Sequence, residues 1–206
     1  MKPTELLVAT GNAGKLREIR ALLNDLPIKL VSLADFPAIE EVAETGSTFV
    51  ENAALKALGY ARQSGLLTLA DDSGLEIDAL DGAPGVRSAR YLADHASYLA
   101  RMNALLTALK AAKDVARTAR FVCALAIAWD KQEVLYTTEG TCEGRIADSP
   151  RGSNGFGYDP VFLPDGYTQT FGELSADIKN GISHRGRALA KAHQFLASLT
   201  ATSATG

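Results

Sequence analysis

The feature that most constrains the fold is an alternation, early in the chain, of short apolar segments with a segment of helical periodicity. The apolar segments are expected to be buried strands and span residues 5–10, 28–33 and 66–70. Between the first two, apolar residues recur at helical spacing: Leu16, Ile19, Leu23 and Leu26. Strand–helix–strand alternation of this kind predicts an α/β sheet with crossover helices.

Local signals place the remaining elements. Thr48 and Glu51 have the spacing of a capping box and predict a helix that runs to about Gln63 and is stopped by Gly65. Three later elements are expected: a long helix, an antiparallel hairpin of two long strands, and a final helix, at residues 95–113, 121–142 and 189–199. Neither a linker nor an internal repeat interrupts the pattern. The sequence therefore predicts one bilobed domain over residues 1–200, followed by a frayed tail at 201–206.

Composition excludes several classes of function. The net charge is −3, from 21 basic and 24 acidic residues, whereas a domain that binds nucleic acid polymers normally has a strong basic excess. The longest apolar run, Phe121–Trp129, is far shorter than the roughly 20 residues that a membrane-spanning helix needs. The two cysteines, Cys123 and Cys142, form no disulfide framework, although the predicted hairpin could bring them together. We therefore expect a cytoplasmic protein with reduced thiols.

Residues Thr10–Lys15 (T-G-N-A-G-K) lie where the first predicted strand gives way to the first helix. Glycines let the backbone approach a ligand closely, a helix N-terminus offers N–H groups, and Lys15 adds a positive charge, so the segment suits a bound phosphate. It is not a Walker A loop, because the glycine spacing is too short and Leu16 replaces the required Ser or Thr. The alternative is a plain strand-to-helix turn with an exposed lysine.

Two adjacent carboxylates, Asp71 and Asp72, directly follow the third apolar segment. Open α/β sheets bind ligands at the carboxyl ends of their strands, so these residues are expected near the first loop. Adjacent residues of a strand point to opposite faces, so only one carboxylate should face a cleft unless the chain turns there. Carboxylate oxygens suit Mg²⁺ that is shared with substrate phosphates. The alternative for Asp71 and Asp72 is a solvated acidic turn. For Glu51, the alternative to a functional role is capping of the predicted helix.

A glycine-rich loop, Ser153–Pro160, carries Phe156, Tyr158 and Asp159. Aromatic side chains on a loop suit stacking on a flat base. The alternative is a packed Ω-loop in which the tyrosine hydroxyl is hydrogen-bonded locally.

The last predicted helix opens with Ser183, His184 and Arg185. Ser183 suits the N-cap position. Positively charged side chains at a helix N-terminus interact unfavourably with the helix dipole. The placement of His184 and Arg185 there therefore favours contact of both side chains with a ligand.

Taken in order, these motifs resemble one family over residues 7–199. They read T-G-N-x-x-K, T-F-x-E-N-A-x-x-K-A, D-D-S-G-L, G-A-P-G-x-x-S-A-R-Y, F-G-Y-D-P and S-H-R. The chain is similar to the inosine/xanthosine triphosphate pyrophosphatases. The resemblance implies a homodimeric α/β fold with an elongated central mixed β-sheet flanked by helices, and two lobes with an active-site cleft between them. It also implies Mg²⁺-dependent hydrolysis of deaminated purine nucleoside triphosphates (dITP, ITP, XTP) to the monophosphate and pyrophosphate, which removes them from the nucleotide pool.

The resemblance also implies roles for individual residues. Asp72 would be the proton acceptor and a metal ligand, and His184 with Arg185 would read the base. The substrate would be bound by Thr10, Gly11, Asn12, Ala13, Gly14, Lys15, Ser73, Phe156, Gly157, Tyr158, Asp159, Lys179, His184 and Arg185. Of these, the residues from Thr10 to Lys15 would hold the phosphates.

The second metal ligand departs from the family pattern. Where we expect a further metal-binding glutamate, this chain has Ala43, with Glu44 beside it. Either Glu44 substitutes, or Asp71, Asp72 and water hold the metal together with the phosphates. Because Mg²⁺ is commonly bound by few protein ligands, activity need not be lost.

Selection of the base requires a hydrogen-bond donor. Inosine and xanthine carry an oxo acceptor where adenine carries an amino donor, so the Arg185 guanidinium or a backbone N–H would pair with the first two and reject adenine. Two other functions are compatible with the same motifs: a purine nucleotide sensor without catalysis, and a general nucleotide phosphatase that releases orthophosphate.

Overall fold

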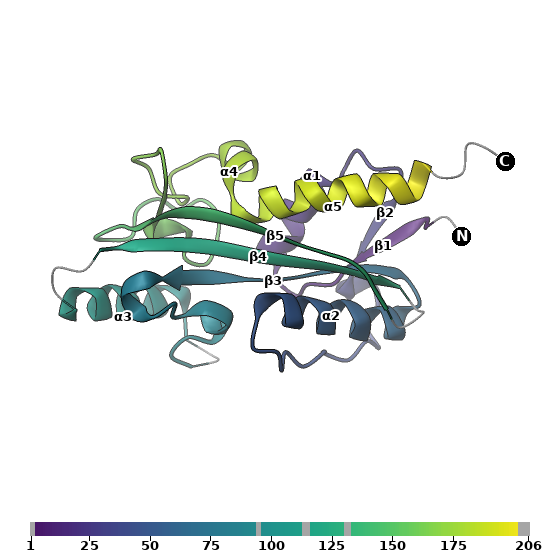
Figure 1. The fold of residues 1–206 in the computed structure, drawn as a ribbon, viewed down its shortest axis with the longest axis horizontal. Helices are drawn as coiled ribbons and strands as arrows, with labels where there is room; N and C mark the ends of the chain where they lie inside the picture. The colour runs from purple at the N-terminus through teal and green to yellow at the C-terminus, as the bar shows by residue number, and fades with distance from the viewer. Residues whose placement is uncertain (1–2, 94–95, 113–115, 130–132, 202–206) are drawn as a thin grey trace. The chain divides into compact units, whose positions relative to one another are not determined.

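The computed structural model describes residues 3–93, 96–112, 116–129 and 133–201. A six-stranded sheet runs through these residues in the order β2-β1-β3-β4-β5-β6 (Figure 1). Pairing is parallel between β1 and each of β2 and β3, and antiparallel between β5 and β6. The strands are β1 (Glu5–Val8), β2 (Lys29–Ser32), β3 (Leu67–Ile77), β4 (Thr118–Trp129), β5 (Glu133–Ile146) and β6 (Phe162–Pro164). The predicted α/β fold with a mixed sheet is confirmed.

The other regular elements of the described residues are helical. They are α1 (Ala13–Leu22), α2 (Phe49–Ser64), α3 (Tyr98–Ala111), α4 (Ala176–Ile182) and α5 (His184–Ala201). Short 3₁₀ turns lie at Leu33–Asp35, Asp78–Leu80, Gly85–Arg90 and Asp159–Val161. The expected limits of the third helix, His95 and Lys113, lie outside the described residues. Ser97 caps that helix, because its side chain accepts a hydrogen bond from the Ala100 N–H.

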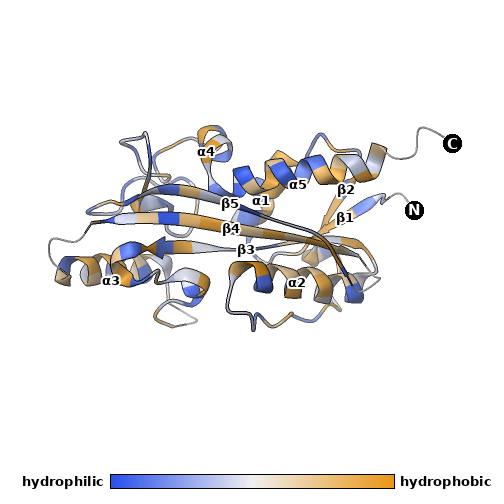
Figure 2. Ribbon diagram, viewed as in Figure 1, coloured by the Kyte–Doolittle hydropathy of each residue, from blue (hydrophilic) through white to orange (hydrophobic). Residues whose placement is uncertain are grey.

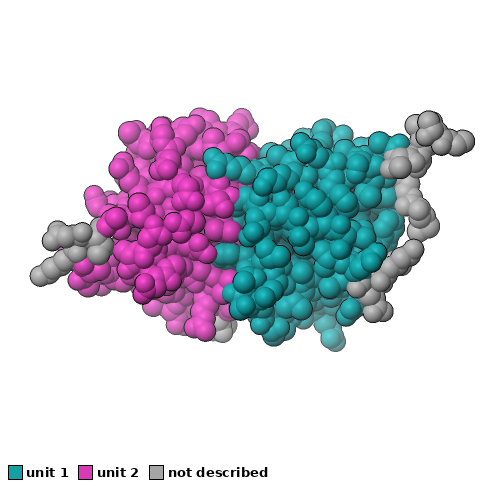
Figure 3. Space-filling view, in the orientation of Figure 1, with its two compact units in different colours: residues 1–72, 123–140, 185–206 teal, residues 73–122, 141–184 magenta. Residues whose placement is uncertain are grey.

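The chain forms two compact units, each assembled from separate stretches of sequence (Figure 3). Unit 1 comprises residues 1–72, 123–140 and 185–206, and unit 2 comprises residues 73–122 and 141–184. In unit 1, α1 and α5 cover one face of the sheet and α2 covers the other (Figure 1). Its core is built from apolar residues of β1, β3 and β4 together with α1 and α5, as the apolar colouring of the central part of β4 illustrates (Figure 2).

Unit 2 has its own core. Leu105 and Leu109 of α3 pack there with Phe121, Phe162 and Phe171. The Phe121 ring centroid lies 4.6 Å from that of Phe162 and 6.1 Å from that of Phe171. Aromatic clusters of this kind bury large apolar areas, so residues 147–175 are held by packing although little of that stretch is regular secondary structure.

The capping signals in the sequence are confirmed at α2. The Thr48 side chain accepts a hydrogen bond from the Glu51 N–H, and the Glu51 carboxylate accepts one from the Thr48 N–H. Gly65 follows the helix in the left-handed conformation, with φ 70°. The predicted role of Glu51 as a capping partner is therefore observed, since both halves of the box are present.

Two further expectations concern β3 and the hairpin. The prediction that the third strand ends near Ala70 is wrong, because β3 continues unbroken through Asp71–Gly74 to Ile77. The acidic-turn interpretation of Asp71 and Asp72 is therefore also wrong. The two long strands predicted near the cysteines are confirmed as the neighbours β4 and β5, while the turn that joins them lies outside the described residues.

Both cysteines are buried free thiols. Burial raises the pKa of the Cys123 thiol to about 12. Across the part of the chain that the structure describes, no helix has the length and apolar character needed to span a bilayer.

Candidate active site

The two carboxylates of β3 have separate sets of partners within unit 1. Asp71 contacts Lys15, whereas Asp72 contacts Asn52 and Lys56 of α2. This division follows from the extended backbone, since adjacent side chains of a strand point to opposite faces. The two side chains therefore point away from each other and join two different polar clusters; which of them faces a cleft stays a prediction.

The Asp71 cluster is the more deeply buried of the two. Its side chain has no exposed area, and Oδ2 lies 3.1 Å from Lys15 Nζ and 3.1 Å from Arg185 Nη2. Burial favours the neutral acid, but the cations around the group, Lys15 and Arg185 above all, outweigh it and hold the pKa of the Asp71 carboxyl well below its usual range. Asp71 therefore remains a carboxylate, and its negative charge attracts the ammonium of Lys15.

The Asp72 cluster links three segments. Asn52 Nδ2 donates to Asp72 Oδ2 at 3.1 Å, and Asn52 Oδ1 accepts from the Gly46 N–H at 2.8 Å. Lys56 Nζ lies 2.7 Å from Glu44 Oε1 and 3.7 Å from Asp72 Oδ1. Asn52 and Lys56 are four residues apart on α2 and so share one face of the helix. They bring the loop that carries Glu44 to the carboxylate of Asp72.

Asp72 has the properties of a proton acceptor. Burial raises the pKa of the Asp72 carboxyl above its ordinary value, and the charge of Glu44 adds to the rise against the opposing charge of Lys56. A carboxylate with a raised pKa is a stronger base than an exposed aspartate, and perturbed groups of this kind gather at active sites.

The chemistry of the donor set fits a magnesium ion. Glu44 and Asp72 both approach the single ammonium of Lys56, so two hard oxygen donors converge on one positive charge. Among the described residues, no group of three or more His, Cys, Asp or Glu side chains is placed to hold a metal. Mg²⁺ is usually held by one or two carboxylates plus substrate phosphates, so two suffice. The position of Glu44 favours it over Asp71 as the second carboxylate that would hold the metal with Asp72.

The charges of both clusters also favour a cation. The carboxylates of Glu18, Glu44, Asp71 and Asp72 face the cations Lys15, Lys56 and Arg185. One negative charge is therefore in excess before any ligand binds. A divalent cation would reverse that sign and make the site attractive to a polyphosphate.

The segment Thr10–Lys15 joins β1 to α1 as predicted. Asn12 is the N-cap, and its Oδ1 accepts from the Gly14 N–H at 2.8 Å and from the Lys15 N–H at 3.1 Å. Two of the helix N-terminal amides are thus already used within the protein. A Cβ built on Gly11 would meet no atom within 4 Å, and Gly11 lies outside the left-handed region. Neither packing nor backbone conformation therefore requires a glycine at this position.

In unit 2, the predicted nucleotide residues cluster around Asp159. Its Oδ2 accepts from the Phe156 N–H at 2.7 Å and lies 2.6 Å from Lys179 Nζ, and both charged side chains are buried. The Lys179 ammonium also lies 4.6 Å from the centroid of the Phe156 ring. Gly155 has φ 73°, and a Cβ there would clash with Asp159 Oδ2. This loop is therefore a preorganised structure that holds Phe156 beside a buried cation.

The remaining unit 2 candidates are mainly packed in the protein interior. The Tyr158 hydroxyl donates to the Ser88 carbonyl at 2.9 Å, and its ring meets Tyr98 edge-on, with centroids 5.4 Å apart. This is the locally bonded tyrosine that the Ω-loop alternative predicts. The buried His184 ring stacks on Phe121, with centroids 4.7 Å apart. Of the loop aromatics, the half-buried Phe156 is thus the better placed to stack on a base.

Arg185 lies in unit 1. Its guanidinium is 2% exposed and contacts the carboxylates of Glu18 and Asp71. That Arg185 reads the base stays a prediction.

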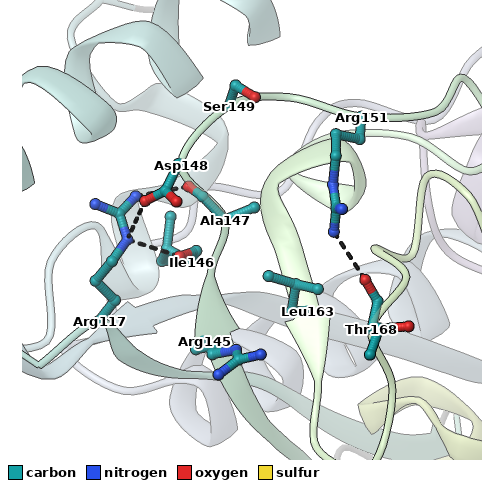
Figure 4. A pocket seen from close by; sticks show the side chains of 9 residues that line it. All are labelled: Arg117, Arg145, Ile146, Ala147, Asp148, Ser149, Arg151, Leu163 and Thr168. Carbon is teal, nitrogen blue, oxygen red and sulfur yellow. Dashed lines mark hydrogen bonds and ion pairs between the residues drawn. The ribbon is translucent and has the colours of Figure 1, made fainter.

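A pocket of about 540 Å³ in unit 2 involves none of the predicted site residues (Figure 4). Its lining includes three arginines. Arg117 donates to the carbonyls of Ile146 and Ala147, and Arg151 donates to the carbonyl of Thr168. Arg117 and Arg151 thus tie the segment after β5 to neighbouring backbone, and their hydrogen-bonding groups are partly used for structure.

Sequence reasoning missed Asn52, Lys56 and Glu18 as site residues. The spacing of Asn52 and Lys56 on α2 was the available signal, since it places an amide and an ammonium on one face near a helix N-terminus. No signal near Glu18 in the sequence indicates its partner, because Arg185 is 167 residues away.

Comparison with known proteins shows the family to which the chain belongs. A model of the Ham1 family matches residues 6–195. A dITP/XTP pyrophosphatase of Geobacter sulfurreducens is 52% identical over 187 residues, which cover 91% of this chain and 94% of that protein. A dITP/XTP pyrophosphatase of Bacillus anthracis is 50% identical over 190 residues, covering 91% and 93%. The solved structure of a HAM1 protein from Coxiella burnetii is 45% identical with a TM-score of 0.87, and the match covers 94% of this chain and 98% of that one. The chain is therefore a member of the Ham1 family.

Proposed function

We propose that this protein hydrolyses deaminated purine nucleoside triphosphates, namely dITP, ITP and XTP, to the monophosphate and pyrophosphate, and so removes them from the nucleotide pool. The observation that carries the proposal is the Asp72 cluster. Asp72, a buried aspartate with a raised pKa, lies in the middle of β3 and shares the ammonium of Lys56 with the carboxylate of Glu44, while Lys15 contacts the neighbouring Asp71. The relatives named dITP/XTP pyrophosphatase supply the substrate class.

Each part of the proposed reaction has residues to perform it. Lys15 and the Gly11 backbone bind the phosphates, and Asp72 accepts a proton from the attacking water as the bond that releases pyrophosphate breaks. General-base assistance of this kind contributes about 10²–10⁴-fold. Glu44 and Asp72 would hold Mg²⁺, which would supply charge neutralisation on the phosphates. In unit 2, Phe156 stacks on the purine while Asp159 and Lys179 hold its loop in place.

Product identity separates this function from the alternatives. The purified chain would be given dITP, XTP, dATP or dGTP with Mg²⁺, and pyrophosphate and orthophosphate would be measured separately. We expect pyrophosphate from dITP and XTP at least about 10²-fold faster than from dATP, because a pocket built to donate to an oxo group rejects an amino group. Orthophosphate as the first product would indicate a phosphatase. Tight dITP binding without any product would indicate a sensor.

We further propose that both units form one catalytic domain and that the protein is a cytoplasmic homodimer. Exposed apolar side chains on unit 2, Leu92 at 61% and Leu99 at 59%, are consistent with a partner surface. The molar mass in solution, from light scattering, tests the dimer directly. A mass near 21.8 kDa would contradict it.

A further inference from the structure

The motif at Gly82–Tyr91, G-A-P-G-V-R-S-A-R-Y, places a buried serine in unit 2. Ser88 lies in the 3₁₀ turn Gly85–Arg90 and is 6% exposed. Its Oγ accepts from the Leu75 N–H of β3 at 2.9 Å and donates to the Gly85 carbonyl at 2.6 Å. Because a serine hydroxyl has a single proton to donate, that proton is committed here, and the hydroxyl fastens the turn to the strand.

The main chain of Ser88 in turn holds the glycine-rich loop Ser153–Pro160. The Tyr158 hydroxyl donates to the Ser88 carbonyl at 2.9 Å, and Tyr158 is 3% exposed. A buried polar group that loses its partner is costly, so this bond favours one position of the tyrosine. Ser88 therefore connects β3, through its hydroxyl, with Tyr158, through its carbonyl.

Helix α3 fixes the ring of the same tyrosine. Tyr98, in the first turn of α3, meets the Tyr158 ring edge-on, with centroids 5.4 Å apart. The Arg101 guanidinium carbon lies 4.9 Å from the centroid of the Tyr98 ring, and Arg101 Nε donates to the Tyr91 carbonyl at 3.1 Å. Because α3 and the end of the motif both converge on Tyr158, its ring and its hydroxyl are each held in place.

Tyr158 lies inside the turn that carries Phe156. The Asp159 N–H donates to the Phe156 carbonyl at 3.2 Å, while the Asp159 carboxylate accepts from the Phe156 N–H at 2.7 Å. These two bonds close a short turn of main chain that contains Gly157 and Tyr158. A shift of Tyr158 within so short a turn moves Phe156 as well, and with it the ring that is proposed to stack on the purine.

We propose that Ser88 is a positioning residue for base recognition: it fixes the Tyr158 hydroxyl and, through the turn, the Phe156 ring. The proposal rests on the proposed function for its substrate. Ser88 and its three hydrogen-bond partners belong to unit 2, whereas the residues that are proposed to bind the phosphates belong to unit 1. Ser88 therefore acts on the affinity for the base and leaves the chemistry at the phosphates unchanged.

Replacement of Ser88 by alanine tests the proposal through a split between KM and kcat. Stacking of a base on an aromatic side chain strengthens binding by about 5- to 150-fold. A misplaced Phe156 ring loses part of this contribution, so KM for dITP should rise about 5- to 20-fold in Ser88→Ala. The value of kcat should stay within about twofold of the wild type, because bond breaking takes place at the phosphates.

A loss of stability alone has a different signature. It would lower the fraction of active enzyme, and hence kcat, without raising KM. Wild-type KM in Ser88→Ala, with or without a fall in kcat, would therefore overturn the proposal. Ser149→Ala makes the same change at an exposed position of unit 2 and is the matched control. It should leave both constants unchanged.

A double-mutant cycle tests the route through Phe156. In a Phe156→Ala background, Ser88→Ala should change KM by less than about twofold, because the ring that it positions is gone. Multiplicative increases in the double variant would overturn the proposal.

A second variant keeps the test valid if Ser88→Ala does not fold, as circular dichroism and thermal melting would reveal. Tyr158→Phe keeps the ring and removes only the hydroxyl that donates to the Ser88 carbonyl. It should raise KM for dITP about 3- to 10-fold, the typical effect of one lost hydrogen bond, with kcat retained. A Tyr158→Phe enzyme with wild-type KM would overturn the proposal. Absence of any pyrophosphate release from the wild-type chain would instead refute the proposed function.

Discussion

Replacing Gly11 by alanine should stabilise the fold and impair the reaction. The new Cβ meets no protein atom within 4 Å, and the backbone of Gly11 lies outside the left-handed region, so the native structure accepts a methyl group without strain. Gly→Ala changes at compatible positions stabilise by about 0.4–1 kcal/mol, because the unfolded chain loses freedom. With a shift of about 2–4 °C per kcal/mol for a chain of this size, Tm should rise by about 1–4 °C.

Activity should change in the opposite direction. If the phosphates approach the Gly11 backbone, a methyl group must displace them by about 1 Å, and kcat/KM for dITP should fall by as much as about 10²-fold. Pyrophosphate release gives the change in kcat/KM, and thermal melting of the same preparation gives the change in Tm. Gly181→Ala is the matched control: it also places a methyl group in open space, but within α4, and should raise Tm without changing kcat/KM. Full activity in Gly11→Ala would refute the phosphate-binding role of this loop.

Three other variants or measurements test separate parts of the structure. Glu51→Ala should lower Tm with kcat unchanged, because the Ser47 and Thr48 N–H groups lose their carboxylate acceptor; a large loss of kcat would show that Glu51 does more than cap α2. Asp159→Asn breaks a buried ion pair of 2.6 Å and should destabilise the protein by about 3–5 kcal/mol, so a melting curve like that of the wild type would contradict the assigned burial. A thiol reagent at pH 8 should label neither Cys123 nor Cys142 in the native protein and both in guanidinium chloride; rapid native labelling would contradict their burial.

Local signals in the sequence were sufficient where the structure depends on neighbouring residues. The capping box of Thr48 and Glu51 and the left-handed Gly65 both lie at the predicted ends of α2. The strand-to-helix turn at Asn12 was also predicted, because caps depend on residues within one turn. Such elements could be derived without knowing where the rest of the chain lies.

The course of β3 could not be derived in that way. The tetrapeptide Asp71–Gly74 has the composition of a turn, yet the chain stays extended through it. In the structure, Asp71 meets cations from α1 and α5, and Asp72 meets donors from α2. Contacts between residues so far apart along the chain leave no local pattern, so the sequence alone favoured the more common interpretation.

The same limit applies to the candidate site. The roles that motif order implies for the unit 1 residues stay predictions, but the separate contacts of Asp71 and Asp72 became visible only in the structure. Arg185 illustrates the point most clearly: the ligand contact favoured by its place in the S-H-R motif stays a prediction, and no local pattern indicated that its guanidinium meets Glu18, 167 residues away, and Asp71, 114 residues away.

The most direct test of the account is single-turnover pyrophosphate release from dITP by the wild-type protein and by Asp72→Asn, with dITP binding measured in parallel by calorimetry. Asparagine keeps the size of the side chain but cannot accept the proton. We predict release by the wild type and a fall of about 10²–10⁴-fold in the variant, while dITP still binds. Undiminished release by Asp72→Asn would contradict the central claim that Asp72 is the proton acceptor of this site.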